Sequence, residues 1–510
     1  MIRGGGSCWH VRERVFASEK TIVSITQDVA HDRPTKRRKA KSVYEQSNQV
    51  NRPAYASDTL ARDDDPFDLF SAHINPRLGR VLQLIGFDKF WQRAAGPYLW
   101  DERGDRYLDL LAGYGVFNIG RNHLRVREAL IDHLSAEAPS LIQLEAPLLA
   151  GMLAKRLKQL VDNRLERVYF TSSGHEGIET AMKFARATTG RSVFIRASAA
   201  FHGLSTGALS LNGTPTFREP FGPSTIDVRE VPFNDLGALE VALHPGDVAA
   251  FVVEPVQGKR VALSAPGYLR EAARLCRRHG ALFVVDEVQT GLGRTGRMFA
   301  FEHDNNVDPD IIVISKALSG GFVPVGAVLY RKHIYDRVFS RLDRCVVHSS
   351  TFGMGAMAMA AGLAVLDVLE HERLAARAER LGDRLGTGLA ALKDRNEFVH
   401  DVRWRGLMLG LEFGPPQSFA LKMAWSLVHR LDQGMFCQAV ILPLFAKHHM
   451  LTQVAGPGVD IIKLIPPLVI DEEDVDTIVA AFADVLGNLL QFPGPAWSAL
   501  TGLARNALRG

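Results

Sequence analysis

The feature that most constrains the fold is a repeated alternation of short apolar runs with stretches of helical pattern. Helical stretches such as Gly177–Thr188 and Tyr268–His279 lie between the runs. Strands that alternate with helices in this way form a mostly parallel sheet with helices on both faces. Ligands of such sheets bind beyond the carboxyl ends of the strands. The apolar runs are Arg167–Phe170, Ser192–Ile195, Ala249–Val253, Ala281–Val285, Ile311–Ile314 and Val325–Tyr330.

Composition and charge exclude several classes of protein. A net charge of +4 over 510 residues gives no electrostatic reason to expect a nucleic-acid partner. The four cysteines are far apart and lack metal-type spacing, so we expect neither a disulfide scaffold nor a metal site. No apolar run reaches the roughly 18 residues that cross a bilayer, and the N-terminus has no apolar stretch of signal-peptide length. These features predict a soluble, cytoplasmic protein.

Residues 1–65 differ from the rest of the chain. They are polar, carry the basic run Lys36–Lys41 and end in Asp63, Asp64 and Asp65. Such a segment can bury little apolar surface, so we expect a disordered basic tail. A solvated tail, or a start codon placed too far upstream, explains the basic run more simply than nucleic-acid binding or targeting does.

The strongest chemical signal lies at the ends of two apolar runs. Leu282–Asp286 delivers a carboxylate, and Ile311–Ile314 is followed by Ser315 and Lys316. A buried carboxylate and a buried lysine at neighbouring strand ends are costly unless they are paired or used. Pyridoxal phosphate (PLP) needs both, because a lysine forms a Schiff base with it and an aspartate keeps its ring nitrogen protonated. The structural alternative is a buried Asp–Lys ion pair.

Two further segments supply the remaining parts of such a site. Ser173 and Gly174 follow one strand and open a helix, whose free amides and dipole can seat a phosphate. Taken alone, this pattern is more often an ordinary helix cap. Phe201-His202-Gly203 follows another strand, and an aromatic ring there can stack on the pyridine face. Taken alone, Phe201 would more often be a core residue.

Over roughly residues 75–490 the chain resembles the class III PLP-dependent aminotransferases of the ornithine, acetylornithine and putrescine type. The resemblance is specific because many motifs recur in order over the length of a domain. The matching segments are Phe117–Gly120, Phe201–Gly203, Glu254–Gly258, Asp286–Gly291, Ser315–Leu318, Ser350–Gly353 and Pro466–Leu468.

The resemblance implies a role for individual residues. Lys316 and Asp286 would be the catalytic pair, and Thr351 would reach the cofactor phosphate of a neighbouring subunit, giving a homodimer with shared active sites. The other cofactor-binding residues would be Ser173, Gly174, His175, Phe201, His202 and Gln289, and the substrate-facing residues would be Tyr114, Glu254, Lys259 and Lys463.

The resemblance also implies an α/β architecture. In a fold-type I PLP enzyme, a large domain holds a mostly parallel seven-stranded sheet flanked by helices, and both chain ends build a small α+β domain. The expected parts are a tail at 1–65, the first part of the small domain at 66–130, the large domain at 131–384, the second part of the small domain at 385–490 and a tail at 491–510. Within the small domain we expect a hairpin of Tyr98–Asp101 with Arg106–Asp109, and helices from about Leu381 and over Asp471–Leu490.

The sequence departs from the family at two positions. Lys259 follows Gly258 where relatives usually carry a glutamate, and Lys463 stands where they usually carry an arginine that binds a carboxylate. Two lysines would leave a positive, unpaired pocket wall in which each lowers the pKa of the other. Lys463 would either anchor glutamate less rigidly than arginine does, or face a donor or acceptor with unusual acidic or bulky groups.

The implied activity is transamination by a ping-pong mechanism, between an amino donor such as glutamate and an aldehyde or keto acceptor. An aminomutase, a decarboxylating transaminase or a racemase on the same scaffold is the alternative within enzymes. A catalytically dead PLP-binding regulator is the alternative outside them, although residues 1–65 lack a helix-turn-helix pattern. The apolar region Ala420–Met450 would suit a hopanoid-like or carrier-bound acceptor, but core packing explains it more simply.

Overall fold

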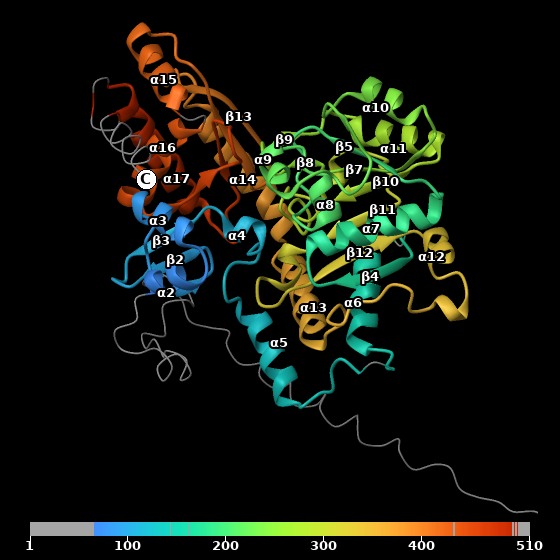
Figure 1. Ribbon diagram of the computed structural model, residues 1–510. Coiled ribbons are helices and arrows are strands. Elements are labelled where there is room, and N and C mark those ends of the chain that lie inside the picture. The colour runs from blue at the N-terminus through green and yellow to red at the C-terminus, as the bar shows by residue number, and fades with distance from the viewer. Residues whose placement is uncertain are drawn as a thin grey trace, which may run out of the picture. The chain divides into compact units, whose positions relative to one another are not determined.

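The centre of the fold is a seven-stranded sheet with the order β4-β12-β11-β10-β7-β5-β6 (Figure 1). The computed structural model describes residues 66–142, 144–162, 164–431, 434–491, 494 and 497. β12 is antiparallel to both of its neighbours, and the other pairs are parallel. The strands are β4 (Arg167–Thr171), β5 (Val193–Ala197), β6 (Val228–Val231), β7 (Val248–Val253), β10 (Leu282–Asp286), β11 (Ile311–Ile314) and β12 (Gly326–Tyr330).

The structure confirms the predicted sheet and all six predicted strands. The seventh strand, β6, lies at an edge of the sheet and has Arg229 and Glu230 at its centre, so it forms no apolar run. β12 follows β11 after a short connection without a crossover helix. A parallel pair needs such a crossover, which is why β12 runs antiparallel.

Helices cover both faces of the sheet, as predicted. Successive strand residues point to opposite faces. Val284 therefore packs in a cluster with residues of α7 (Gly174–Thr189), whereas Phe283 and Val285 pack in another cluster with residues of α11 (Tyr268–His279) and α13 (Ala356–His371). The other helices of this part are α5 (Leu124–Ser135), α6 (Leu148–Gln159), α8 (Thr206–Ser210), α9 (Pro215–Arg218), α10 (Leu236–Leu243) and α12 (Lys332–Val338).

Segments near the two ends of the described chain come together in smaller sheets. The predicted hairpin is present as β2–β3, and β3 pairs in parallel with β15, which lies more than 300 residues later. The first small sheet contains β1 (Trp91–Ala95), β2 (Tyr98–Asp101), β3 (Arg106–Asp109) and β15 (Met450–Leu451). The second contains β13 (Val399–Arg405), β14 (Met408–Phe413), β17 (Ile461–Leu464) and β16 (Gln453–Val454). A two-stranded ladder joins β8 (Val256–Gln257) to β9 (Ala262–Leu263).

Helices of the C-terminal part agree with the prediction in type and differ in their bounds. The amphipathic helix expected from Leu381 begins earlier, and the final helix ends within one residue of its expected bound. Most of the described part of the apolar region Ala420–Met450 is helical, and its Trp425 and Phe436 rings lie 4.5 Å apart in the core. Core packing accounts for these buried residues, whereas Met423 and Leu427 are exposed. The helices are α14 (Leu374–Ala390), α15 (Phe419–Leu431), α16 (Met435–His448) and α17 (Glu472–Leu489), with α2 (Pro66–His73), α3 (Pro76–Leu84) and α4 (Ala112–Gly115) from the N-terminal side.

Several predictions fall beyond these elements. The basic tail at 1–65 and most of the tail at 491–510 lie outside the described residues. The expected domain boundaries within 66–490 stay a prediction. Among the helices that the structure describes, none is long and apolar enough to span a bilayer.

Candidate active site

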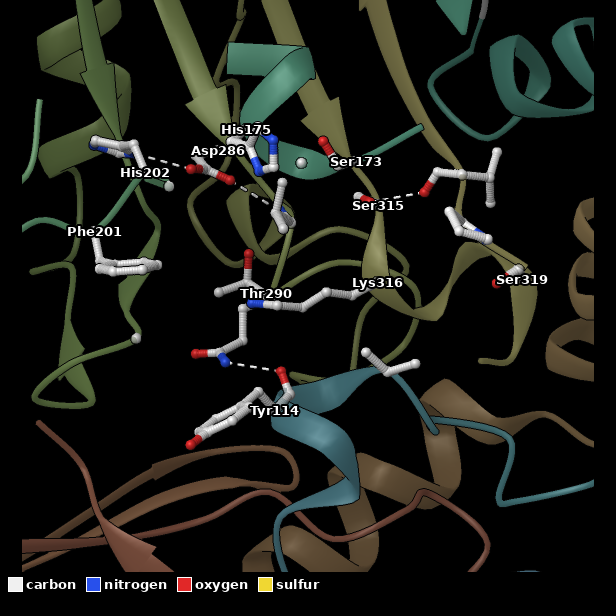
Figure 2. A pocket seen from close by; sticks show the side chains of 18 of the residues that line it. Tyr114, Ser173, His175, Phe201, His202, Asp286, Thr290, Ser315, Lys316 and Ser319 are labelled. Atoms are coloured by element: carbon white, nitrogen blue, oxygen red, sulfur yellow. Dashed lines mark hydrogen bonds and ion pairs between the residues drawn. The ribbon is translucent and has the colours of Figure 1, made fainter. Parts of the chain in front are cut away.

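A cavity of about 560 Å³ opens at the carboxyl ends of the central strands (Figure 2). It brings together residues from segments that are far apart in the chain. Of the predicted site residues, Tyr114, Ser173, Gly174, His175, Phe201, His202, Glu254, Lys259, Asp286, Gln289, Lys316 and Lys463 line it. The remaining one, Thr351, is exposed and lies outside this cavity.

Asp286 is the buried carboxylate of the cavity. It is the last residue of β10 and is only 4% exposed. Its Oδ1 accepts a hydrogen bond from the Val288 amide (3.0 Å), and its Oδ2 lies 2.8 Å from His202 Nδ1. The ion-pair partner of Asp286 is therefore His202 and not Lys316, which leaves the lysine amine available.

Lys316 lies just beyond the end of β11, the strand next to β10. Asp286 and Val313 are register partners in this pair of strands, so Asp286 and Lys316 lie at the same end of the sheet. The Lys316 side chain extends across the cavity (Figure 2). Burial is the main cause that lowers the pKa of Lys316 to about 8. The charges of Asp286 and Glu254 act to raise this pKa, and the charge of Lys259 lowers it further. The backbone of Lys316 has φ of 38°, a strained conformation for a residue with a side chain, and such strain is concentrated at functional sites.

The N-terminus of α7 forms another wall of the cavity. Ser173 caps this helix, since its Oγ accepts a hydrogen bond from the Glu176 amide (3.3 Å). Gly174 packs against Val288, and a Cβ atom at Gly174 would come within 2.8 Å of the Val288 side chain. The backbone therefore approaches the cavity closely here. The first amides of a helix attract an anion through their free hydrogens and the helix dipole.

Glu254 holds the segment that carries Phe201. Its side chain is buried, and its two oxygens accept hydrogen bonds from the amides of Phe201 (3.0 Å) and Gly258 (2.8 Å). Burial raises the pKa of Glu254. The Phe201 ring also contacts the Phe217 ring edge-to-face, with 5.4 Å between centroids. Glu254 is thus engaged by the backbone on both oxygens.

The two unusual lysines lie in the same cavity with different surroundings. Lys463 is 3% exposed, and its Nζ donates to the Gly258 carbonyl (2.8 Å). Burial, then the charges of Lys316 and Lys259, lower the pKa of Lys463 to about 7. Lys259 Nζ lies 4.4 Å from the centroid of the Phe201 ring. Burial lowers the pKa of Lys259 as well, and Glu254 opposes the change.

Sequence reasoning missed other residues around the cavity. Val288 contacts Gly174 and donates to Asp286, a local turn that its spacing of two residues from Asp286 could have suggested. Ser319 also lines the cavity. Gln453 hydrogen-bonds the Tyr114 hydroxyl across 339 residues of sequence, and no local pattern predicts such a contact.

Comparison with known proteins identifies the family. Residues 86–486 match the family Aminotransferase class-III. The chain belongs to the class III aminotransferases. It is 35% identical over 474 residues to aminotransferase PigE of Serratia sp. (strain ATCC 39006). The aligned residues cover 86% of this chain and 56% of the relative. The chain thus spans little more than half the length of that curated relative.

Two solved structures share the fold. The ornithine aminotransferase of Toxoplasma gondii, described with partial occupancy of PLP at its active site, is 31% identical with a TM-score of 0.70 and covers 79% of this chain and 90% of its own. The acetylornithine aminotransferase of Elizabethkingia anophelis is 30% identical with a TM-score of 0.62 and covers 78% of this chain and 94% of its own. These matches confirm the predicted fold-type I architecture.

PLP is the cofactor of class III aminotransferases, and the residues of the cavity fit it. The free amides at the start of α7 suit its phosphate. Asp286 suits its ring nitrogen and Lys316 its aldehyde, while Phe201 and Val288 offer apolar surface for the ring. The role of each residue stays a prediction.

Proposed function

We propose that this chain catalyses PLP-dependent transamination between an amino donor, such as glutamate, and an aldehyde or keto acceptor in two half-reactions. The observation that carries the proposal is the placement of Asp286 and Lys316 at neighbouring strand ends around one cavity, opposite a helix N-terminus. A catalytically dead PLP-binding regulator would not need both residues. Nothing in the cavity favours an aminomutase or a decarboxylating transaminase over transamination.

Bound PLP would supply an aldehyde that captures the substrate amine and a ring that accepts electrons from it. Asp286, held by His202 and the Val288 amide, would keep a proton on the ring nitrogen. The Lys316 Nζ would take the proton from the substrate carbon that carries the amino group and return it elsewhere on the reacting system. Because the pKa of Lys316 is about 8, a useful fraction of this amine is neutral near that pH.

The substrate proposal rests on the charge of the cavity. Three lysine amines lie around the cavity. The carboxylate of Glu254, which also lines it, is already engaged, because backbone amides donate to both of its oxygens. An anionic group on one substrate would compensate this positive charge. We therefore propose that Lys463 and Lys259 handle an acidic substrate and that plain diamines react poorly. Glutamate and a bulkier acidic compound are both compatible with this wall.

The proposal includes a homodimer with shared active sites. Thr351 is exposed, and apolar side chains near it are exposed as well, including Val346 at 75% and Phe352 at 66%. Exposed apolar surface of this kind is typical of an interface. The described cysteines Cys276, Cys345 and Cys437 are free, which fits the reducing cytoplasm that we propose as the location.

The experiment that tests the proposal is a half-reaction screen. The PLP-loaded protein is mixed with a panel of amines that includes glutamate, ornithine and putrescine, and the loss of the cofactor's visible absorbance band is followed. We expect an acidic donor to discharge the band and a keto acid to restore it. A panel without any response from the loaded wild type would contradict the proposal.

The Lys316→Ala variant is the matched control for that screen. Borohydride should attach the cofactor covalently to the Lys316 peptide of the wild type, and mass spectrometry should find no attachment in the variant. Covalent attachment at the cavity of Lys316→Ala would show that another lysine holds the cofactor.

A further inference from the structure

The side chain of Gln453 forms a hydrogen bond with Tyr114, a residue that lines the cavity. Its Nε2 donates a hydrogen bond to the Tyr114 hydroxyl (2.7 Å). Tyr114 lies on α4 and lines the cavity, whereas Gln453 lies on β16 and is not one of the lining residues. The hydrogen bond therefore connects the tip of a rim side chain to a strand of the second small sheet.

Tyr114 is held at several points besides its hydroxyl. Its backbone has φ of 62°, in the left-handed region, and its carbonyl accepts a hydrogen bond from Gln289 Nε2 (2.9 Å; Figure 2). The Lys463 Nζ lies 5.8 Å from the centroid of its ring. The side chain is 47% exposed, so packing alone does not fix the ring. The Gln453 hydrogen bond is the contact that orients its exposed end.

The same pair of strands carries both Gln453 and Lys463. The two residues are cross-strand partners in the antiparallel pair of β16 with β17, so their side chains emerge on the same face. The neighbouring Thr452 is fully buried, and its Oγ1 donates to the Lys463 carbonyl (3.1 Å). One short antiparallel ladder thus places both the Lys463 ammonium and the Gln453 amide that binds the Tyr114 hydroxyl.

We propose that Gln453 is a positioning residue of the substrate pocket: it holds the Tyr114 ring beside Lys463, and so limits the access of water and of substrates to that ammonium. The inference rests on the proposed function only in taking Tyr114 and Lys463 as substrate-facing. Without the Gln453 hydrogen bond, the exposed Tyr114 ring swings away from Lys463. Water then reaches the ammonium, and the burial that lowers the pKa of Lys463 is relieved.

A purely structural role makes a different prediction. If the hydrogen bond only ties two segments together, its loss lowers the melting temperature and leaves the surroundings of Lys463 unchanged. The test therefore needs a readout on Lys463 itself. The variants are Gln453→Leu, which removes the donor, Tyr114→Phe, which removes the acceptor, and the double variant. The matched control is Gln83→Leu, a change of the same type on the exposed surface of α3.

The first measurement is trace acetylation of Lys463 in the PLP-loaded protein with acetic anhydride, followed by mass spectrometry across a pH series. Both Gln453→Leu and Tyr114→Phe should raise the midpoint pH of Lys463 labelling by about half a pH unit or more, and the limiting rate at high pH severalfold. Gln83→Leu should match the wild type. An unchanged midpoint and limiting rate in folded Gln453→Leu protein would overturn the proposal.

The second measurement separates binding from turnover with glutamate as the acidic partner. At pH 8, each single variant should lower the KM for glutamate about twofold or more, because Lys463 is then more accessible and more often charged, and should leave kcat within about twofold. The double variant should lower the KM no further than the stronger single variant, because both changes remove the same hydrogen bond. Fully additive effects on KM would overturn the proposal. If the wild type turns over no amine, the proposed function fails, but the labelling result still decides the role of Gln453.

Discussion

His202 Nδ1 lies 2.8 Å from Asp286 Oδ2, with both side chains buried beside the cavity. Burial of the ring works to lower the pKa of His202, but the hydrogen bond and the charge of Asp286 outweigh it, so this pKa lies above its ordinary value. The pairing, together with the Val288 amide, fixes the Asp286 carboxyl group at the end of β10. A carboxylate held at this place is what a protonated ring nitrogen of PLP requires.

Replacing Asp286 tests that requirement. Asp286→Asn keeps the size of the side chain but cannot stabilise a positive ring nitrogen. We expect the variant to retain PLP and to lose roughly a hundredfold or more in kcat, a typical size for a proton-linked contribution. The measurement is kcat with the best amine, together with the PLP content. Asp310→Asn, a change at the opposite end of the sheet where Asp310 binds the Phe283 amide, is the control. Near-normal turnover in Asp286→Asn would remove Asp286 from the mechanism.

Shared active sites predict complementation between two inactive chains. If Thr351 completes the phosphate site of a neighbouring subunit, a mixture of Lys316→Ala and Thr351→Ala chains contains heterodimers with one intact site. We expect the mixture to regain up to about a quarter of the wild-type activity after the subunits exchange, because half of random dimers are mixed and each has one intact site. Heterodimers that form but stay inactive would indicate that each site is built from one chain.

The pKa of Lys463 predicts a pH dependence for the acidic substrate. With a pKa of about 7, Lys463 is charged below that pH and becomes neutral as the pH rises through it. The KM for an acidic partner should therefore increase between about pH 6 and pH 8, relative to the KM for a neutral partner, which corrects for the titration of Lys316. Lys463→Arg should flatten this increase because arginine stays charged.

Variants of Lys463 also separate the two substrate hypotheses. Lys463→Ala should raise the KM for the acidic partner at every pH and alter the cofactor spectrum little. Lys463→Arg should be tolerated if that partner is glutamate, and damaging if the pocket accommodates a bulkier acidic group. Putrescine as the best donor, combined with a Lys463→Ala variant that is indifferent to acidic partners, would contradict this interpretation of the two lysines.

Glu287 should make the stability of the protein depend on pH. The side chain is 1% exposed, and burial raises its pKa from 4.5 to about 7, although Thr290 and the Phe301 amide donate to it. Folding thus favours the protonated carboxyl, and this stabilisation is complete below about pH 4.5 and lost as the pH rises through about 7. Glu287→Gln removes the effect. Its free energy of unfolding relative to the wild type should increase between pH 5 and pH 8, by at most about 3 kcal/mol.

The measurement is urea denaturation of both proteins at the two pH values. The exposed Glu128→Gln on α5 is the matched control, and it should show the same difference from the wild type at both. An equal effect of Glu287→Gln at pH 5 and pH 8 would mean that Glu287 does not titrate differently on folding.

The strands, and the placement of Asp286 and Lys316 at neighbouring strand ends, could be predicted because their signals are local. β10 and β11 are continuous apolar runs; β10 ends in Asp286, and β11 is followed by Ser315 and Lys316. A charged residue at such a place is expected only in a functional site or an ion pair. The seven-stranded sheet followed from the alternation of such runs with helices together with the family resemblance. The edge strand β6 escaped prediction because half of its residues are charged and one face of it is less buried.

The sequence by itself determined which segments form strands and helices, and which of them carry the cofactor motifs. The pattern of apolar side chains and the capping of helices depend on a few neighbouring residues, so both can be recognised locally. Only the tertiary structure decided that Asp286 pairs with His202, that Lys463 donates to Gly258 and that Gln453 holds Tyr114. These partners lie 84, 205 and 339 residues apart. Their contacts depend on how sheets and loops from different parts of the chain pack around one cavity, and no local pattern records that geometry.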